Sequence, residues 1–276
     1  MPDENEPGVR ELPALDVLLP LDLEGRHLPT ESGEVALGAL LAPRTGRSVR
    51  ANMVSTLDGG ATGADHVSGS INGPADGRVF RVLRALADVV LIGAGTARAE
   101  GYSALGVPDG LAGLRAANGL APTLELAVVT RSGDLPPTLL GLDRPPLVVT
   151  RGSDPEVVAR LRAELGDDRI VVAGEEEVDL AAALDHLADR GLRRVLAEGG
   201  PSLLADLLDA GLLDELFLTW SPTLVGGPAL RPTRSEHWFS PAICATPAHL
   251  LHADGVLLGR WTIDPSTRVR RSRPGH

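Results

Sequence analysis

One stretch of the chain, residues 195–208, constrains the fold more than any other. It reads VLAEGGPSLLADLL. Its first three residues are apolar, as in a buried strand, and the glycine pair leads into a proline and leucines at helical spacing. A strand that passes through glycines into a helix indicates an α/β fold. Because the first turn of a helix has unpaired N–H groups and glycines let a ligand approach the backbone, the loop between strand and helix is predicted to bind phosphate.

Strands and helices alternate on both sides of this stretch. Apolar runs typical of strands occur at residues 50–54, 89–92, 124–129, 147–149, 170–172, 216–220 and 256–263. Apolar residues recur at helical spacing in residues 74–87, 155–165 and 180–190. The order predicts an α/β three-layer sandwich, in which helices cover both faces of a mostly parallel sheet and antiparallel strands are added near the C-terminus. Ligands in such folds bind beyond the carboxyl ends of strands.

The two ends of the chain lack this alternation. Residues 1–47 have no clear periodicity and carry several prolines, so we expect an N-terminal arm that packs on the main domain, residues 48–265. Residues 266–276 are rich in arginine and are expected to form a basic, disordered tail. Residues 103–122 are glycine-rich and are predicted to form a surface loop near the site.

Composition excludes several classes of function. The net charge of −11 disfavours a nucleic-acid surface and favours a small-molecule substrate. No apolar run is long enough for a membrane helix and the first residues are acidic, so we expect a cytoplasmic protein with no membrane partner. The chain has no lysine, which excludes a Walker A site and lysine Schiff bases. One cysteine and scattered histidines predict no metal site.

A second glycine loop, Gly93-Ala94-Gly95-Thr96, follows the strand predicted at residues 89–92. It begins like a dinucleotide-binding fingerprint, but Arg98 stands where the third glycine would be, so the Rossmann interpretation fails. Two glycines and a threonine at the start of a helix still favour an anion site over a simple tight turn.

Arginines supply two further candidates. Arg131, with Thr130 and Ser132 beside it, follows a strand and would suit a phosphate monoester such as the 2′-phosphate of NADP, whereas the alternative is an ordinary solvated loop arginine. On the helix at 74–87, Arg78 and Arg81 are best interpreted as part of a solvated or salt-bridged face. Arg84 has more apolar neighbours and is the candidate to meet a phosphorylated substrate.

Two carboxylates, Asp58 and Glu198, follow predicted strands. Such a pair could polarise a nitrogen heterocycle or relay a proton. An acidic residue in a turn also commonly caps backbone N–H groups, and the sequence alone leaves both interpretations open.

Several motifs, taken together and in chain order, resemble the reductase domain of bacterial riboflavin biosynthesis, within the dihydrofolate-reductase-like superfamily. They are STLDG at 55–59, SGSING at 68–73, LRALAD at 83–88, GAGTARAE at 93–100, EGGPSL at 198–203, LLDEL at 212–216 and TLVGG at 223–227. The resemblance covers roughly residues 48 to 263. It implies a dihydrofolate-reductase-like α/β fold, NADPH as hydride donor, and a homodimer. Family enzymes open and reduce the ribose of a phosphoribosylamino-pyrimidine to a ribityl chain.

The resemblance also implies roles for individual residues. Ser68, Arg84 and Glu198 would face the substrate, and Ser70 would approach the nicotinamide. Together with the glycine and arginine loops above, the expected cofactor site comprises Ser70, Gly93, Gly95, Thr96, Glu100, Arg131, Ser132, Gly199, Gly200, Pro201, Ser202 and Leu203. The expected catalytic residues are Asn52, Asp58 and Glu198.

Two departures from the family pattern bear on specificity. Family members carry a lysine six residues before the aspartate of the LDG turn, where this chain has Asn52, which cannot donate a proton as an ammonium does. An arginine expected after Glu100 to bind the substrate phosphate is absent near Leu105. The leading hypothesis is an NADPH-dependent reductase of a pyrimidine-type substrate. The alternatives are a dihydrofolate or pteridine reductase and a catalytically silent NADP-binding dimer.

Overall fold

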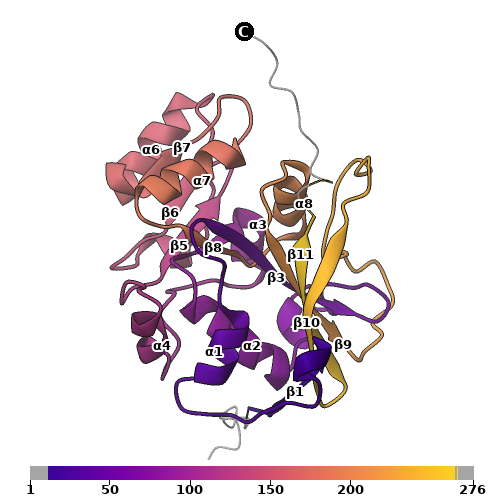
Figure 1. The fold of residues 1–276 in the computed structure, drawn as a ribbon. Helices are drawn as coiled ribbons and strands as arrows, with labels where there is room; N and C mark the ends of the chain where they lie inside the picture. Colours follow the sequence, from indigo (N-terminus) through magenta and orange to yellow (C-terminus); the bar gives the residue numbers. More distant parts are fainter. Residues whose placement is uncertain (1–11, 265, 267–276) are drawn as a thin grey trace, which may run out of the picture.

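One sheet runs through the computed structural model, which describes residues 12–264 and residue 266 (Figure 1). The strands are β1 (Leu15–Leu19), β2 (His27–Leu28), β3 (Ser48–Thr56), β4 (Val89–Gly93), β5 (Glu125–Val129), β6 (Leu147–Thr150), β7 (Ile170–Val172), β8 (Arg194–Ala197), β9 (Glu215–Ser221), β10 (Ala245–Ala253) and β11 (Val256–Ile263). The helices are α1 (Val35–Leu41), α2 (Pro74–Ala85), α3 (Ala94–Ala99), α4 (Ala112–Ala117), α5 (Pro137–Leu140), α6 (Pro155–Leu165), α7 (Leu180–Asp189) and α8 (Pro201–Asp209). Short 3₁₀ turns lie at Leu21–Leu23, Ser68–Ser70 and Asp167–Arg169.

The strands of the described residues follow the order β2-β1-β10-β11-β9-β3-β8-β4-β5-β6-β7. From β9 through β3 to β7 every pairing is parallel, whereas β11, β10, β1 and β2 are added by antiparallel pairing. The observed sheet is therefore the mostly parallel one with antiparallel C-terminal strands that the sequence predicts.

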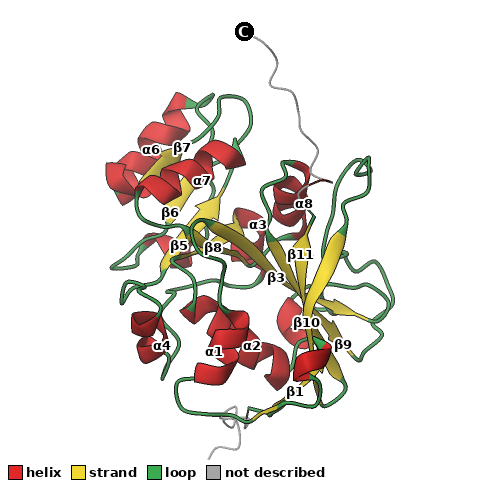
Figure 2. Ribbon diagram, viewed as in Figure 1, coloured by secondary structure: helices red, strands yellow, loops and turns green. Residues whose placement is uncertain are grey.

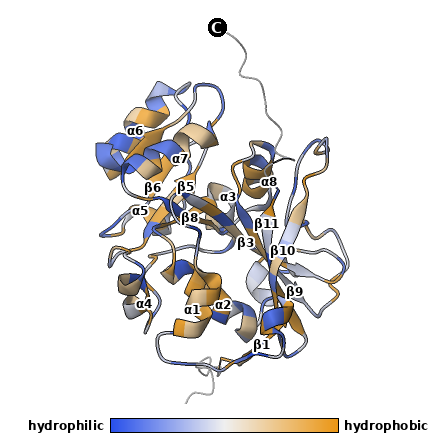
Figure 3. Ribbon diagram, in the orientation of Figure 1, coloured by the Kyte–Doolittle hydropathy of each residue, from blue (hydrophilic) through white to orange (hydrophobic). Residues whose placement is uncertain are grey.

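Helices cover both faces of the sheet (Figure 2). Buried residues of α1, α2 and α4 pack on one face in a core with Phe217 of β9. Buried residues of α7 and α8 form the core of the opposite face with β3 and β8. Figure 3 shows apolar residues along α8 and more hydrophilic residues along α6. The predicted three-layer α/β sandwich is confirmed.

The central strand β3 is buried along all of its nine residues and lies between β9 and β8. A strand buried on both faces normally carries apolar residues, yet β3 includes Arg50, Asn52 and Thr56. Arg50 donates to the carbonyls of Leu41 and Leu86, which satisfies part of its guanidinium inside the core. Burial lowers the pKa of Arg50 to about 10.

Three segments differ from the sequence expectations. Residues 12–47 supply β1, β2 and α1 rather than an aperiodic arm, because β1 pairs with β10, a partner far away in the sequence. Residues 103–122 contain the helix α4 rather than only a loop. Residues 1–11 of the arm, and all of the expected basic tail except residue 266, lie outside the described residues. Within the described part of the chain, no helix is long and apolar enough to cross a membrane.

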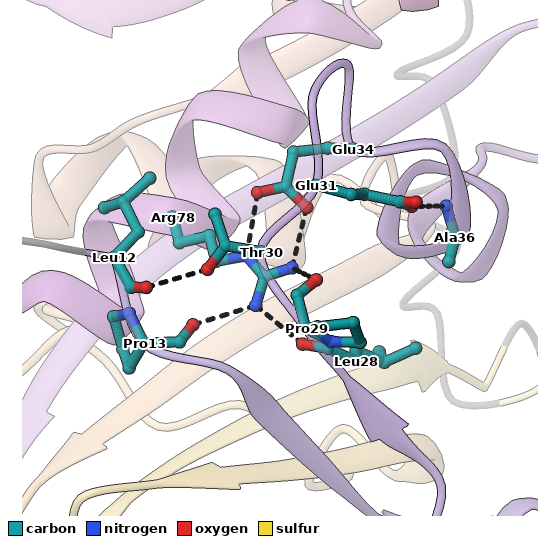
Figure 4. A network of polar contacts seen from close by, with 9 residues as sticks. All are labelled: Leu12, Pro13, Leu28, Pro29, Thr30, Glu31, Glu34, Ala36 and Arg78. Atoms are coloured by element: carbon teal, nitrogen blue, oxygen red, sulfur yellow. Dashed lines mark hydrogen bonds and ion pairs between the residues drawn. The ribbon is translucent and has the colours of Figure 1, made fainter.

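Of the two interpretations of Arg78, solvated or salt-bridged, the structure shows the salt-bridged one, and only 1% of the residue is exposed. Its guanidinium forms a bidentate pair with Glu34, with Nε–Oε1 and Nη2–Oε2 distances of 2.8 and 2.7 Å (Figure 4). The remaining donors reach the carbonyls of Pro13, Leu28 and Pro29. Helical periodicity cannot separate a buried arginine from a solvated one, because the distinction depends on chain that packs against the helix from elsewhere.

Candidate active site

A cavity of about 650 Å³ lies where β3, β4 and β8 end. Residues of β3, the loops after β4 and β8, and one side of α2 line it. This is the carboxyl edge of the parallel strands, where α/β folds bind their ligands. The volume is within the range typical of small-molecule sites.

The two predicted glycine loops meet in this cavity. The N–H of Gly93 donates to the carbonyl of Gly199 at 3.0 Å, which ties the loop after β4 to the loop after β8. Gly199 has a φ of 106°, a conformation that favours glycine. A Cβ atom on Gly200 would lie 2.6 Å from Oγ1 of Thr96, so a side chain there would fill the space beside that hydroxyl. The glycines therefore keep a backbone-walled groove open.

Helix α8 begins at this groove and follows Gly200, its N-cap residue. The N–H groups of Ser202 and Leu203 lie in the first turn, where they have no partner within the helix. Ser202 and Leu203, with Pro201, Gly95 and Thr96, line the cavity. Open backbone and unpaired N–H groups fit the pyrophosphate of a dinucleotide.

Arg84 and Glu198 lie together in the cavity as a bidentate ion pair. Nε and Nη2 of Arg84 donate to Oε1 and Oε2 of Glu198, each at 2.7 Å. The hydroxyl of Tyr102 also donates to Oε2 of Glu198 at 2.7 Å. The side chain of Glu198 is 2% exposed and that of Arg84 is 21% exposed. Glu198 is thus an oriented acceptor whose oxygens are both in use.

Burial and charge fix the protonation of this cluster. Burial alone would lower the pKa of Arg84, but the hydrogen bond and negative charge of Glu198 outweigh it and raise the pKa. Burial, and then the charge of Glu198, raise the pKa of Tyr102 far above its usual value. Arg84 therefore remains a cation and Tyr102 remains a neutral donor.

Asp76 is a second buried carboxyl group in the cavity, and sequence reasoning missed it. It is 5% exposed and its Oδ1 accepts a hydrogen bond from the Thr219 hydroxyl at 2.6 Å. Burial raises its pKa to about 6, against a smaller opposing effect of Thr219. Asp76 lies in the first turn of α2, where acidic residues are common because they interact favourably with the helix dipole, so its sequence position gives little reason to choose it.

One stripe of α2 faces the cavity. Asp76, Phe80 and Arg84 are spaced four residues apart and all line it. The guanidinium of Arg84 lies 4.1 Å from the ring centroid of Phe80. This spacing is the signal that could have identified Asp76. Tyr102, also missed, is the chain's single tyrosine and has no comparable periodic signal.

Asn52, Ser68 and Glu100 also line the cavity. Oε1 of Glu100 accepts a hydrogen bond from the N–H of Ser68 at 2.8 Å, which joins the loop before α2 to the end of α3. Oδ1 of Asn52 is buried and has no hydrogen-bond partner among the described residues. Its unused acceptor is available to a bound ligand.

Four predicted site residues are not among those that line the cavity. Asp58 accepts hydrogen bonds from Thr56 and from the N–H groups of Val225 and Gly226, and these, that of Thr56 first, lower its pKa. The structure therefore places Asp58 in a turn-stabilising role rather than beside a reacting atom. The hydroxyl of Ser70 donates to Asp65 instead of pointing to the cavity residues.

Arg131 and Ser132 are the other two, and they follow β5. Arg131 is 70% exposed on its side chain and lies 3.6 Å from Glu177, while Ser132 accepts from the N–H of Asp134. β5 is the neighbour of β4, so an extended ligand lying across the end of β4 would approach them. No cluster of histidine, cysteine, aspartate or glutamate suited to a metal ion occurs in the described part of the chain.

Comparisons with known proteins identify the family of the chain. Residues 47–244 match the family model described as the RibD C-terminal domain. The 2,5-diamino-6-ribosylamino-4(3H)-pyrimidinone 5′-phosphate reductase of Archaeoglobus fulgidus is 29% identical over 64% of this chain and 80% of its own length. The enzyme of the same name from Methanothermobacter thermautotrophicus is 34% identical over 64% and 78%.

Solved structures show the same fold. A pyrimidine reductase-like protein from Corynebacterium diphtheriae superposes with a TM-score of 0.69 and 26% identity, covering 79% of this chain and 92% of that one. The Saccharomyces cerevisiae riboflavin biosynthesis reductase Rib7 has a TM-score of 0.56 at 14% identity over 81% and 91%. The chain therefore belongs to the RibD C-terminal domain family.

Proposed function

We propose that the protein is an NADPH-dependent reductase of a ribosylamino-pyrimidine of the kind used in riboflavin biosynthesis. The observation that carries the proposal is the meeting of two glycine loops and a helix N-terminus with the Arg84–Glu198–Tyr102 cluster in one cavity. The first group fits a dinucleotide and the second fits a polar substrate. The names of the related reductases support the same reaction.

The cofactor would lie along the groove beneath Gly199 and Gly200. The N–H groups of Ser202 and Leu203 would hold the pyrophosphate, and Thr96 and Glu100 would line its other side. Arg131 and Ser132 would meet the 2′-phosphate beyond β4. NADPH, when bound, supplies a hydride. The protein contributes position and a cavity shielded from water.

On the substrate side, Nη1 of Arg84 would supply N–H donors, because Nε and Nη2 already bind Glu198. Tyr102 and Glu198 hold that guanidinium in one orientation. In the net reaction, hydride adds to the carbon of a C=N bond in the opened ribosylamine and a proton adds to its nitrogen. The amide of Asn52 is not an acid, so this proton comes from another group or from water.

A pteridine or dihydrofolate substrate is the second candidate, and the charge of the cavity favours it. Among the described residues that line the cavity, the guanidinium of Arg84 is the one permanent cation, and Glu198 already neutralises it. Asp76 and Glu100 add negative charge. A 5′-phosphate prefers several cationic donors, whereas an unphosphorylated heterocycle does not need them.

Steady-state oxidation of NADPH against both substrates decides between these candidates. Turnover of the ribosylamino-pyrimidine supports the first, and turnover of dihydrofolate alone contradicts it. If calorimetry shows NADPH binding while neither substrate is turned over, the protein is instead a silent NADP-binding protein.

The 2′-phosphate assignment predicts that Arg131→Ala weakens binding of NADPH by about tenfold or more while NADH binding changes little, because only NADPH carries the phosphate. Calorimetric titration of both nucleotides measures the difference. The matched control is Arg162→Ala, which removes an exposed arginine of α6 that pairs with Asp167. Equal losses for both nucleotides would remove Arg131 from the cofactor site.

We also propose a cytoplasmic homodimer. The supporting observation is the exposure of large apolar side chains around the 224–238 loop, with Leu224 73% and Trp238 90% exposed. Sedimentation equilibrium tests the dimer, and a monomer at all concentrations would contradict it.

A further inference from the structure

The reduction proposed above places a proton on the substrate nitrogen, and most polar groups of the cavity cannot supply it. The amide of Asn52 and the guanidinium of Arg84 are not acids near neutral pH. Tyr102 holds its proton tightly, because burial and the charge of Glu198 raise its pKa far above the usual value. Asp76, whose pKa burial raises to about 6, is mainly ionised at neutral pH. The donor is therefore to be sought among the other residues of the cavity.

His66 is the one histidine among the described residues that line the cavity. The residue is exposed, so it lies at the open side of the cavity, where water can reach it. Its φ of 63° lies in the left-handed region, which costs a residue with a Cβ atom about 1 kcal/mol. Histidine tolerates this region better than most residues do, yet strained backbone of this kind is concentrated at functional sites. Its place and its backbone both single out His66.

A tight turn holds His66 in this position. The N–H of His66 donates to the carbonyl of Gly63 at 3.1 Å, and the N–H of Gly63 donates to the carbonyl of Val67 at 3.3 Å. Oδ1 of Asp65 accepts from the N–H of Val67 at 3.2 Å and from the hydroxyl of Ser70 at 2.8 Å. The pKa of Asp65 is lowered, first by the hydrogen bond from Ser70 and in smaller part by the positive charge of His66. A carboxylate therefore accompanies the protonated imidazole on a loop that its own hydrogen bonds brace.

We propose that His66 is the proton donor of the reduction. This step rests on the proposed reductase function and adds a catalytic residue to it. The N–H bond of the imidazolium breaks, and its electron pair stays on the ring nitrogen. The substrate nitrogen binds the proton with the π electrons of the C=N bond, while the hydride forms a new bond to the carbon. The substrate gains the two electrons of the hydride, NADPH is oxidised to NADP⁺, and the imidazole is left neutral. Both candidate substrates contain such a C=N bond.

The place of His66 in the fold suits this step. It comes from the loop before α2, whereas the glycine loops proposed to hold the cofactor follow β4 and β8. A donor on a different loop leaves the approach of the hydride free. The hydrogen bond from the N–H of Ser68 to Glu100 ties the loop of His66 to the end of α3. Exposure to solvent lets the ring regain a proton from water after each turnover.

Single-turnover oxidation of NADPH over a range of pH tests the proposal, with whichever candidate substrate the wild-type protein reduces. The variant is His66→Asn, because asparagine also accepts the left-handed backbone but is not an acid. We expect its rate to fall about a hundredfold, as on loss of a general acid, while calorimetric binding of NADPH stays unchanged. The wild-type rate should decrease from about pH 6 to 9, because only the protonated imidazole donates, and His66→Asn should lack this decrease.

Other titrating groups surround His66, so the assignment depends on the difference between wild type and variant. The charged groups near it are Asp65 on its own loop, Asp76 of α2, Glu100 after α3 and the Arg84–Glu198 pair. A decrease with pH that persists in His66→Asn would assign the proton to one of these groups, Asp76 first, and overturn the inference.

Further variants separate chemistry from structure. His66→Gly also fits the backbone, and added imidazole should restore part of its lost rate, which a purely structural role of His66 would not allow. The matched control is His186→Asn, which removes an exposed histidine of α7 and should keep the wild-type rate. A wild-type rate in His66→Asn overturns the inference and leaves the proposed function standing. If the wild-type protein reduces neither substrate, the proposed function fails and the proton step fails with it.

Discussion

Two faces of helix α2 each carry an arginine that pairs with a glutamate, but the two arginines have different roles. Arg78 and Arg84 are six residues apart and each forms a bidentate pair with a glutamate. All the donor groups of Arg78 are engaged, three of its hydrogen bonds going to backbone carbonyls. Arg84 donates from Nε and Nη2 to Glu198, and its side chain lines the cavity and is 21% exposed. An arginine whose donors are all engaged in the core holds the fold together, whereas one in the wall of a cavity can meet a ligand.

The largest expected effect is a loss of stability on replacing Arg78, whose donor groups are all engaged. Arg78→Ala removes the partner of Glu34, which is 5% exposed, and leaves three carbonyls without their donor. Breaking a buried pair in this way typically costs about 3–5 kcal/mol. Urea unfolding should show this loss, while Arg81→Ala on the neighbouring turn should cost much less. A loss below about 1 kcal/mol for Arg78→Ala would show that the two faces do not differ as described.

The next largest expected effect is a gain in stability, and it comes from replacing Asp76 on the cavity face of α2. Asp76 has an ordinary pKa of 3.8 and a folded-state pKa of about 6, so the folded protein binds this proton more tightly than the unfolded chain. Stability therefore falls as the pH rises from about 4 to 6 and stays reduced above. At pH 8, Asp76→Asn should stabilise the protein by up to about 3 kcal/mol, at about 1.4 kcal/mol per pKa unit.

Unfolding at a series of pH values checks this, because the gain from Asp76→Asn should disappear near pH 4. A gain that is independent of pH would point to better packing of the amide rather than to relief of a buried charge.

Arg84→Ala should separate activity from stability. We expect kcat/KM to fall about thirtyfold, or about 2 kcal/mol of transition-state binding, because the substrate loses its donors and Glu198 loses its orientation. The free energy of unfolding should fall by less than half of the Arg78→Ala loss, since Tyr102 still donates to Glu198 and water from the cavity can fill the place of the 21% exposed guanidinium. If the two variants lose equal stability, Arg84 is also a structural residue.

The smallest effect should follow from Tyr102→Phe, which removes one hydrogen bond to Glu198 and keeps the Arg84 pair. We expect transition-state binding, calculated from kcat/KM, to weaken by about 1 kcal/mol. The decrease should appear in kcat if Tyr102 acts by positioning the pair. Thr138→Val, which removes a hydroxyl bound to the backbone carbonyl of Tyr102, is the control for a purely structural effect.

How much of the site the sequence predicts depends on how local the signal is. The loops at Gly93 and Gly199 are predictable, because glycines between an apolar strand and a helix usually mark a close approach of the backbone to a ligand or a neighbouring loop. Arg84 and Glu198 are each recognisable as candidates, yet their pairing joins residues 114 positions apart and has no sequence signature. Asp76 escapes prediction because acidic residues are common in the first turn of any helix.

The N-terminal segment shows the same limit for the fold. Strand β1 is short and pairs with β10, more than two hundred residues later in the chain, so no local pattern indicates it. The sequence leaves open whether Arg78 is solvated or salt-bridged, because the residues that bury and pair it come from that same segment. Sequence periodicity describes a helix by itself and cannot show what covers it.

The contacts of Arg78 have a practical consequence for the boundaries of this enzyme. The family match begins at residue 47, but the groups that bind the Arg78 guanidinium are the carbonyls of Pro13, Leu28 and Pro29 and the carboxylate of Glu34. A shortened protein that starts at the boundary suggested by homology would expose an unpaired cation in the middle of α2. The region that the family model matches is therefore smaller than the region whose contacts hold α2, and residues 13–34 belong to the latter.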